Sequence, residues 1–182
     1  MITIKPGLEA DAVRAALRRL LDATGDLSPV MREIGEALVD STRRRFQAGR
    51  APDGTAWAQN SPVTVEHFLR RYSGARRKDG RGLTKKGQQL AGSKRPLIGE
   101  SLALSTQIAY RASALAVEVG SPMVYAAVQQ FGAAQGAFGR TRRGAPIPWG
   151  TIPARPFLGL SSDDTSVILE LISDHLRRTA RG

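Results

Sequence analysis

Few residues of this 182-residue chain are of the types that carry out nucleophilic, acid–base or metal chemistry. The chain has no cysteine, which excludes disulfides, thiolate metal sites and thiol catalysis. Its two histidines, His67 and His175, lie far apart in the sequence, so they do not form the cluster that a metal site or a catalytic triad needs. His175 sits among Ile168, Leu171 and Ile172, and we interpret it as a packed or helix-edge histidine.

The carboxylates that could act as acids, bases or metal ligands have structural explanations. Asp163 and Asp164 stand at the expected start of the last helix, where unpaired N–H groups and the helix dipole favour negative charge. Asp53 lies in the turn sequence Pro52-Asp53-Gly54, in which aspartate is a standard residue. No Walker sequence, GxSxG motif or metal-ligand cluster is present. We therefore predict no enzyme activity, cofactor or metal; a nuclease or hydrolase using Asp53 or Asp163 is the alternative to be tested.

Basic residues are abundant, and they are concentrated in two segments. The chain has 27 lysines and arginines against 16 aspartates and glutamates, a net charge of +11. Between Glu66 and Pro96 there are ten basic residues and two acidic ones. Between Ala133 and Arg143 there are three basic residues and no acidic one, so these two segments carry the whole excess of positive charge. We predict that they contact nucleic acid or a partner protein. The thirteen residues are Arg70, Arg71, Arg76, Arg77, Lys78, Arg81, Lys85, Lys86, Lys94, Arg95, Arg140, Arg142 and Arg143.

Both segments are predicted to be long loops, at residues 70–96 and 132–150, because both are rich in glycine. Loops of this length inside a compact domain are commonly functional or disordered. Clustered lysine and arginine can contact phosphates, and Phe68 and Tyr72 beside the first loop could stack on bases. Contact with acidic protein surfaces, or simple solvation, is the other interpretation. No base-reading motif is visible, so sequence-specific recognition is not expected.

Helical periodicity and capping signals place five helices. They are expected over residues 8–22, 29–48, 64–72 and 121–132, and from residue 162 onward. Gly49 suits the end of the second helix, and Ser162-Asp163 is expected to cap the last one. In the fourth helix, Val124, Val128 and Phe131 fall on one side.

Alternating apolar residues predict an antiparallel hairpin over residues 101–119, turning near Ala112-Ser113 and burying one face. Residues 152–161 are expected to be extended, because Pro153 and Pro156 restrict the backbone. The resulting order of elements predicts a single α+β domain over residues 1–182, in which amphipathic helices pack on one face of a small antiparallel sheet that carries long basic loops.

Four local patterns, in this order along the chain, resemble the phage virion morphogenesis family, the tail-completion proteins that include Mu-like phage neck and tail proteins. The patterns extend from about Phe46 to Ser161. The first is Phe46-x-x-Gly49 followed by Pro52-Asp53-Gly54-x-x-Trp57. The others are Leu97-Ile98-Gly99-Glu100-Ser101-Leu102; Val117-Glu118-Val119-Gly120 with Tyr125-Ala126 and Gln130-Phe131-Gly132; and Ile152-Pro153-Ala154-Arg155-Pro156-Phe157-Leu158-Gly159.

The resemblance implies a non-enzymatic structural protein that forms a homo-oligomeric ring at the head–tail junction of a tailed phage. It implies contacts with other copies of the chain and with neck, connector and tail-tube proteins, and a lumen through which genomic DNA passes. The protein would be assembled in the host cytoplasm and reside in the virion. No membrane is expected, because no apolar run approaches the roughly 20 residues of a membrane span. The alternative is a sequence-nonspecific nucleic-acid-binding module that uses the basic loops.

Overall fold

The computed structural model describes residues 27–99 and 101–179, together with positions 11, 14, 15, 18 and 22. The helix expected over residues 8–22 falls mostly outside these described residues. None of the described helices is long and apolar enough to cross a membrane. The elements are α2 (Ser28–Ala48), α3 (Pro62–Leu69), α4 (Lys85–Ser93), α5 (Ala103–Thr106), β1 (Ala109–Ala112), β2 (Val117–Gly120), α6 (Ala126–Phe131) and α7 (Ser162–Thr179).

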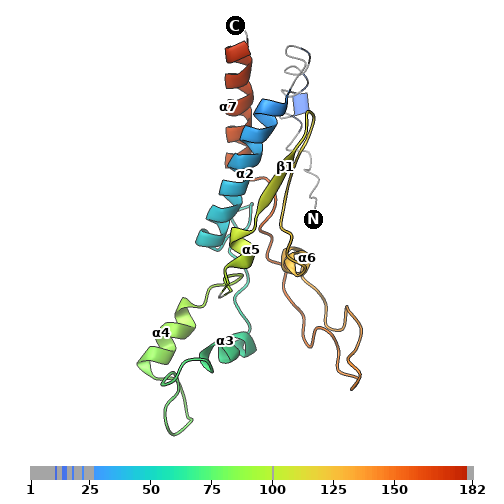
Figure 1. Ribbon diagram of the computed structural model, residues 1–182. Helices are drawn as coiled ribbons and strands as arrows, with labels where there is room; N and C mark the ends of the chain where they lie inside the picture. Colours follow the sequence, from blue (N-terminus) through green and yellow to red (C-terminus); the bar gives the residue numbers. More distant parts are fainter. Residues whose placement is uncertain are drawn as a thin grey trace.

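The body of the molecule is built from two long helices and one β-hairpin. α2 and α7 lie side by side, and the β1–β2 hairpin packs against α2 (Figure 1). The strands are antiparallel, with Tyr110 opposite Val119. Helices therefore cover one face of a small antiparallel sheet, which confirms the predicted α+β class.

α2 is the element around which the body is organised, and its limits agree with those predicted from the sequence. Proline lies in its first turn, and Gly49 ends it with a left-handed φ of 68°, which glycine adopts without steric cost. One end of the helix buries Val30 and Ile34 against Ile168 and Ile172 of α7. The other end places Phe46 in a second core cluster, with Trp57 and Phe157 among its members.

The first half of the predicted hairpin is wrong. Residues Ala103–Thr106 form the short helix α5, and β1 begins only at Ala109. The side chains of Ser105 and Thr106 both donate hydrogen bonds to the carbonyl of Leu102, and such local bonds compete with a strand ladder. Leu102 itself has a positive φ of 53°, which an extended strand does not accommodate. The turn of the hairpin, from Ser113 to Ala116, lies close to the predicted position.

α6 is shorter than predicted and differs in the side that it buries. It begins at Ala126, so the start expected at Ser121-Pro122 is wrong. The apolar side predicted for it is also wrong, because Val124 is 97% exposed and Phe131 is 63% exposed. The helix instead buries Ala126 and the polar Gln130.

Close packing between α2 and the hairpin makes Gly35 a sensitive position. A Cβ atom added at Gly35 would overlap the ring of Tyr110, and the Tyr110 hydroxyl donates to Glu36 Oε1 at 3.2 Å. We expect Gly35→Ala to lower the free energy of unfolding by about 1–3 kcal/mol, because the ring and the strand must shift. Urea unfolding measures the change.

The matched control is Gly92→Ala in α4. A Cβ atom there would meet nothing within 4 Å, so we expect a neutral or slightly stabilising effect of at most about 1 kcal/mol. Equal losses of stability in the two variants would contradict the packing described for Gly35.

Candidate functional site

The candidate site is built around the extended stretch from Ile152 to the start of α7, whose backbone is partly buried but belongs to no sheet. Ile152 pairs with Ala133 in an isolated bridge, and the following residues up to α7 form no strand. Phe157 and Leu158 in this stretch are 0% and 4% exposed. Buried backbone N–H and C=O groups must find partners, so side chains have to supply the hydrogen bonds that a neighbouring strand would otherwise make.

Gln130 of α6 supplies three of these bonds. Its Oε1 accepts from the backbone N–H groups of Phe157 at 2.9 Å and Leu158 at 3.0 Å. Its Nε2 donates to the carbonyl of Leu158 at 2.9 Å. The side chain is only 5% exposed, so a single buried amide takes the place of a paired strand and ties α6 to the segment.

Arg45 of α2 holds the same segment from the other side. Its Nη1 donates to the carbonyls of Phe157 at 3.1 Å and Gly159 at 2.9 Å, and its Nη2 forms a buried ion pair with Asp164 of α7. Burial lowers the pKa of Arg45, while the neighbouring carboxylate of Asp164 acts in the opposite direction. One guanidinium therefore joins α2, the extended segment and α7.

The start of α7 differs from the cap predicted at Ser162-Asp163. Ser161 Oγ accepts from the N–H of Asp164 at 3.1 Å, and Asp164 Oδ2 accepts from the N–H of Ser161 at 2.8 Å. This reciprocal arrangement is a capping box with aspartate in the place of glutamate. Asp163 is exposed and Asp164 is 5% exposed. The structural role predicted for this acidic pair thus falls mainly on Asp164.

Arg155 and Trp57 complete the set of side chains that hold the segment. Arg155 donates to the carbonyls of Ala58 at 2.7 Å and Gln59 at 2.9 Å, and burial lowers its pKa. Trp57 Nε1 donates to the carbonyl of Pro156 at 2.7 Å. We call Arg45, Trp57, Gln130, Arg155 and Asp164 the polar clamp, and residues 155–159 the clamped segment.

The predicted motif residues divide into buried and exposed groups. Phe46 lies between Trp57 and Phe157, with ring centroids 5.3 Å from each. Tyr125 and Phe131 are 45% and 63% exposed, so they lie outside the core.

The turn and the tight backbone approaches account for the remaining motif residues. Asp53 Oδ1 accepts from the backbone N–H and the hydroxyl of Thr55, and these hydrogen bonds lower the pKa of Asp53. Gly54 has a φ of 82° in the same turn. Asp53 therefore has a structural role in the turn.

Two motif glycines lie where the backbone approaches other residues closely. A Cβ atom on Gly159 would lie 2.8 Å from Pro52 Cγ, and one on Gly132 would lie 2.7 Å from the carbonyl oxygen of Ile152.

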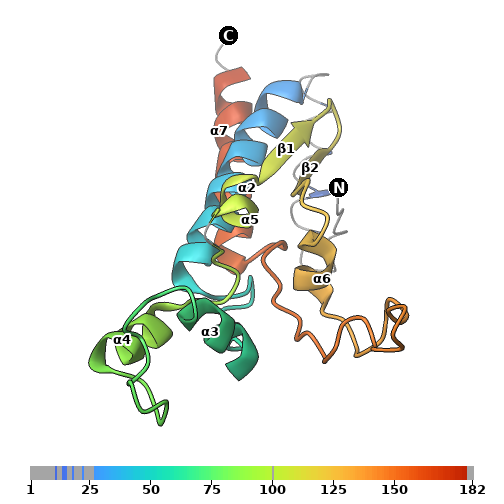
Figure 2. The ribbon, with the colours of Figure 1, turned by 60° about the horizontal axis from the view of Figure 1, so that its bottom comes forward.

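Two projections leave the same end of the body, one on either side of the clamped segment (Figures 1 and 2). We call residues 60–96 the lobe and residues 133–152 the arm. α3 corresponds to the helix expected over residues 64–72, but residues 70–96 are not the continuous loop that the sequence predicted, because they contain α4. The Thr84 hydroxyl caps α4 by accepting from the N–H of Gly87 at 3.1 Å, and this N-cap was the signal that the sequence interpretation missed.

Most basic residues of the lobe have internal partners or lie at its tip, and Lys85 is exposed at the start of α4. Arg70 and Arg76 both pair with Glu66, and the hydrogen bond from Arg76 is the main cause of the lowered pKa of Glu66. Backbone carbonyls accept from three others: Lys86 donates to Ser73, Lys94 to Ile98 and Arg95 to Gln47. Residues 76–83 form a tight hairpin, and its exposed tip carries Arg77, Lys78 and Arg81.

The arm is an irregular hairpin with apolar sides and a basic tip. Backbone bonds join Phe138 to Ile147 and Ile147 to Gly139, both at 2.8 Å. Phe138 and Trp149 are 57% and 77% exposed. Arg140 Nη1 donates a hydrogen bond to the carbonyl of Gly144 at 2.9 Å, whereas Arg142 and Arg143 are exposed at the tip. The prediction for this segment rested on its charge alone and did not include Phe138 and Trp149.

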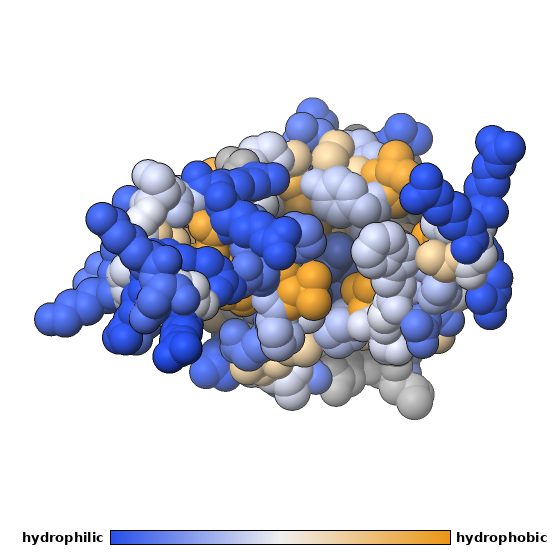
Figure 3. Space-filling model, turned by 90° about the horizontal axis from the view of Figure 1, so that it is seen from below, coloured by the Kyte–Doolittle hydropathy of each residue, from blue (hydrophilic) through white to orange (hydrophobic). Residues whose placement is uncertain are grey.

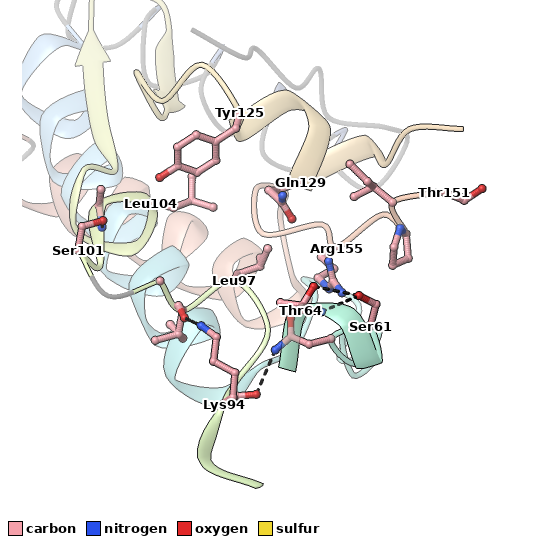
Figure 4. A pocket seen from close by; sticks show the side chains of 16 residues that line it. Ser61, Thr64, Lys94, Leu97, Ser101, Leu104, Tyr125, Gln129, Thr151 and Arg155 are labelled. Atoms are coloured by element: carbon pink, nitrogen blue, oxygen red, sulfur yellow. Dashed lines mark hydrogen bonds between the residues drawn. The ribbon is translucent and has the colours of Figure 1, made fainter. Parts of the chain in front are cut away.

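A hollow of about 430 Å³ lies between the lobe and the arm, and three of the four motifs meet around it. Leu97 and Ile98 line it together with Tyr125 and Arg155 (Figure 4). None of its described lining residues is acidic. Seen from this end, hydrophilic side chains gather over both projections and apolar patches lie between them (Figure 3). The arrangement suits docking of a macromolecular surface better than enclosure of a small substrate.

The histidines do not come together in the fold. His67 lies on α3 and His175 on α7, two helices in separate parts of the molecule (Figure 2). Within the described residues, no group of three or more histidine and acidic side chains is placed to hold a metal ion.

Comparison with known proteins gives a consistent family assignment. Residues 8–177 match the phage virion morphogenesis family. The chain is 31% identical over 169 residues to the Mu-like prophage FluMu G protein 2 of Haemophilus influenzae, which covers 92% of this chain and 91% of that protein. It is also 31% identical over 165 residues to the tail completion protein S of Escherichia phage P2, which covers 88% and 94% respectively. No solved structure gives a significant match.

The polar clamp predicts that Gln130 contributes strongly to stability. Gln130→Ala leaves two N–H groups and one carbonyl buried without partners, so we expect the free energy of unfolding to fall by about 2–5 kcal/mol. The matched control is Gln129→Ala, one position away on the same helix and at the rim of the hollow, with an expected change within about 0.5 kcal/mol. Urea unfolding compares the two, and similar losses in both variants would contradict the role of Gln130.

Proposed function

The chain belongs to the phage virion morphogenesis family, and from this premise we propose that it is a structural protein of tail completion that acts at the head–tail junction as a ring of identical copies. One relative is itself described as a tail completion protein. The proposed partners are other copies of the chain and the adjacent neck, connector and tail-tube proteins. The protein would be assembled in the host cytoplasm and reside in the virion, with genomic DNA passing through the ring.

The observation that supports this function best is the pair of projections on a rigidly held base. The clamped segment runs directly into the arm at Ile152, so the base of the arm is fixed by the polar clamp. The arm exposes Phe138, Trp149 and cationic side chains, and aromatic residues and arginine are enriched at protein–protein interfaces. A subunit that lies between two other rings needs a rigid body and extensions that bind neighbouring subunits.

We propose that the protein has no enzyme activity and forms one domain. Of the candidate carboxylates, Asp53 is occupied in a turn and Asp164 in the polar clamp, while Asp163 is exposed at the start of α7. The hollow is wide and open, and its Lys94 and Arg155 side chains donate to backbone carbonyls. These features favour a docking surface over a catalytic centre.

Loss of the protein tests the proposal in a phage that encodes it. When the gene is disrupted, we expect electron micrographs of lysates to show separate heads and tails, with infectivity reduced by several orders of magnitude. Supplying the wild-type chain from a plasmid is the control and should restore joined particles. Particles that are joined and infectious without the chain would refute the proposed function.

A second candidate function, sequence-nonspecific DNA binding, is favoured by one observation: the basic tips of the lobe and the arm project from the same end of the molecule (Figure 1). Substituting alanine for Arg77, Lys78 and Arg81 removes three cations that could pair with phosphates. If DNA binding is a main function, the slope of log K against log salt should fall in magnitude by about 0.9 for each phosphate that is no longer neutralised.

The tail-completion proposal predicts instead that the wild-type chain shows no measurable binding to duplex DNA at physiological salt. Fluorescence anisotropy with labelled duplex and single-stranded DNA over a salt series distinguishes the two functions. Binding that persists at physiological salt and depends on the three tip residues would favour the DNA-binding module.

A further inference from the structure

The arm has an exposed surface of mixed chemistry that none of the described residues covers. Phe138, Ile147 and Trp149 are 57%, 38% and 77% exposed. Residues 133–152 contain three arginines and no acidic residue, and Arg142 and Arg143 stand exposed at the tip. Removing such aromatic surface from water stabilises an association, so the arm requires a partner surface that is partly apolar and carries negative charge.

A surface of complementary chemistry lies on α7 and the adjoining part of α2. Asp163, Val167, Glu170 and Asp174 follow one another at intervals of four, three and four residues, which places them on one face of α7. All four are exposed, and Val167 is 40% exposed. Asp174 is paired with Arg177 at 2.6 Å, so Asp163 and Glu170 are the acidic residues on which the argument rests. We call this surface the α7 face.

A groove of about 230 Å³ beside Val167 adds an apolar floor to the α7 face. It is lined by Ala37 and Leu38 of α2 and by Val167 and Ile168 of α7. Asp40, which is paired with Arg43 at 3.8 Å, and Arg44 also line it. Arg44 offers a cation that can stack on an exposed indole ring. The groove therefore suits an aromatic side chain flanked by arginines, which is the combination that the arm presents.

The helix that carries the α7 face and the arm lie on opposite sides of the body. α7 is on one side of the body, and the arm hangs from the other side in both ribbon views (Figures 1 and 2). In this arrangement the arm does not contact the α7 face of its own chain, but the arm of one copy can contact the α7 face of another copy, head to tail. Such a heterologous contact closes into a ring when the rotation between neighbours allows it.

We infer that the arm of one copy docks on the α7 face of the next copy, with Trp149 and Phe138 against the groove and Arg142 and Arg143 beside Asp163 and Glu170. The inference deepens the proposed function, because it names the contact that builds the ring. A groove on an acidic neighbouring protein, or a stretch of DNA, would be the other occupant of the arm.

Cysteine crosslinking tests the contact directly, because the chain has no cysteine of its own. Arg143→Cys on the arm is combined with Ser166→Cys at an exposed position of α7 next to Val167, so that Arg142 and the acidic residues are retained. Mild oxidation of this double variant should give a ladder of disulfide-linked multimers on a denaturing gel. The control combines Lys78→Cys, at the tip of the lobe, with Ser166→Cys, and should give none.

Charge exchange provides a second and independent measurement. The double substitution Arg142→Glu with Arg143→Glu reverses the charge at the tip of the arm. The double substitution Asp163→Lys with Glu170→Lys reverses the charge of the α7 face. Each pair alone should weaken self-association about tenfold, as measured by sedimentation velocity, because the charge pairs at the rim of the interface become repulsive. Mixing the two variant proteins should restore association, because each arm then meets an α7 face of opposite charge.

The absence of arm-to-α7 crosslinks, or a mixture that associates no better than the separate variants, would overturn the inference. Failure of the proposed function is a separate result: phage particles would then be complete without the chain, whatever its self-association. If particles require the chain but the arm does not crosslink to α7, the arm binds another partner and only the present inference fails.

Discussion

The three hydrogen bonds between the Gln130 amide and the backbone of Phe157 and Leu158 allow an extended segment to cross the core without a neighbouring strand. Arg45 satisfies the carbonyls on the other side of this segment and continues into the ion pair with Asp164. These contacts join α2, α6 and α7, which are far apart in the sequence. Because breaking such a network leaves several buried polar groups without partners at once, the free-energy cost is expected to exceed that of a single surface contact.

The polar clamp also explains why the family-like motifs have the residues that they have. Trp57 and Phe46 pack on the segment and Arg155 ties it to the chain after the turn, so most motif residues maintain the base from which the lobe and the arm project. Two other motif residues, Tyr125 and Phe131, are exposed, and Tyr125 lines the hollow. Specificity for partners then resides in surfaces that the clamp positions, and the excess of positive charge lies on those surfaces more than in the body.

Local sequence signals were sufficient to predict the elements whose structure depends on interactions between residues close together in the sequence. The limits of α2 follow from its helical periodicity and from Gly49, and the turn at Asp53 follows from its residue types. The β-strand predicted around Leu102 failed because alternation of apolar residues does not reveal a left-handed φ or hydroxyl groups that bond locally. Gln130 was part of a family-like motif, but the buried roles of Gln130 and Arg45 could not be predicted, since their partners lie 28 and 112 residues away and a polar residue in a helix is usually taken as solvent-exposed.

Amide hydrogen exchange measured by NMR is the most direct test of the central claim that side chains hold the clamped segment as firmly as a sheet would. We expect the N–H groups of Phe157 and Leu158 to exchange only through global unfolding, at rates like those of buried amides in α2, while Phe138 and Ile147 of the arm exchange through local opening. Exchange of Phe157 and Leu158 as fast as that of the arm amides would contradict the account, because the segment would then open independently of the core.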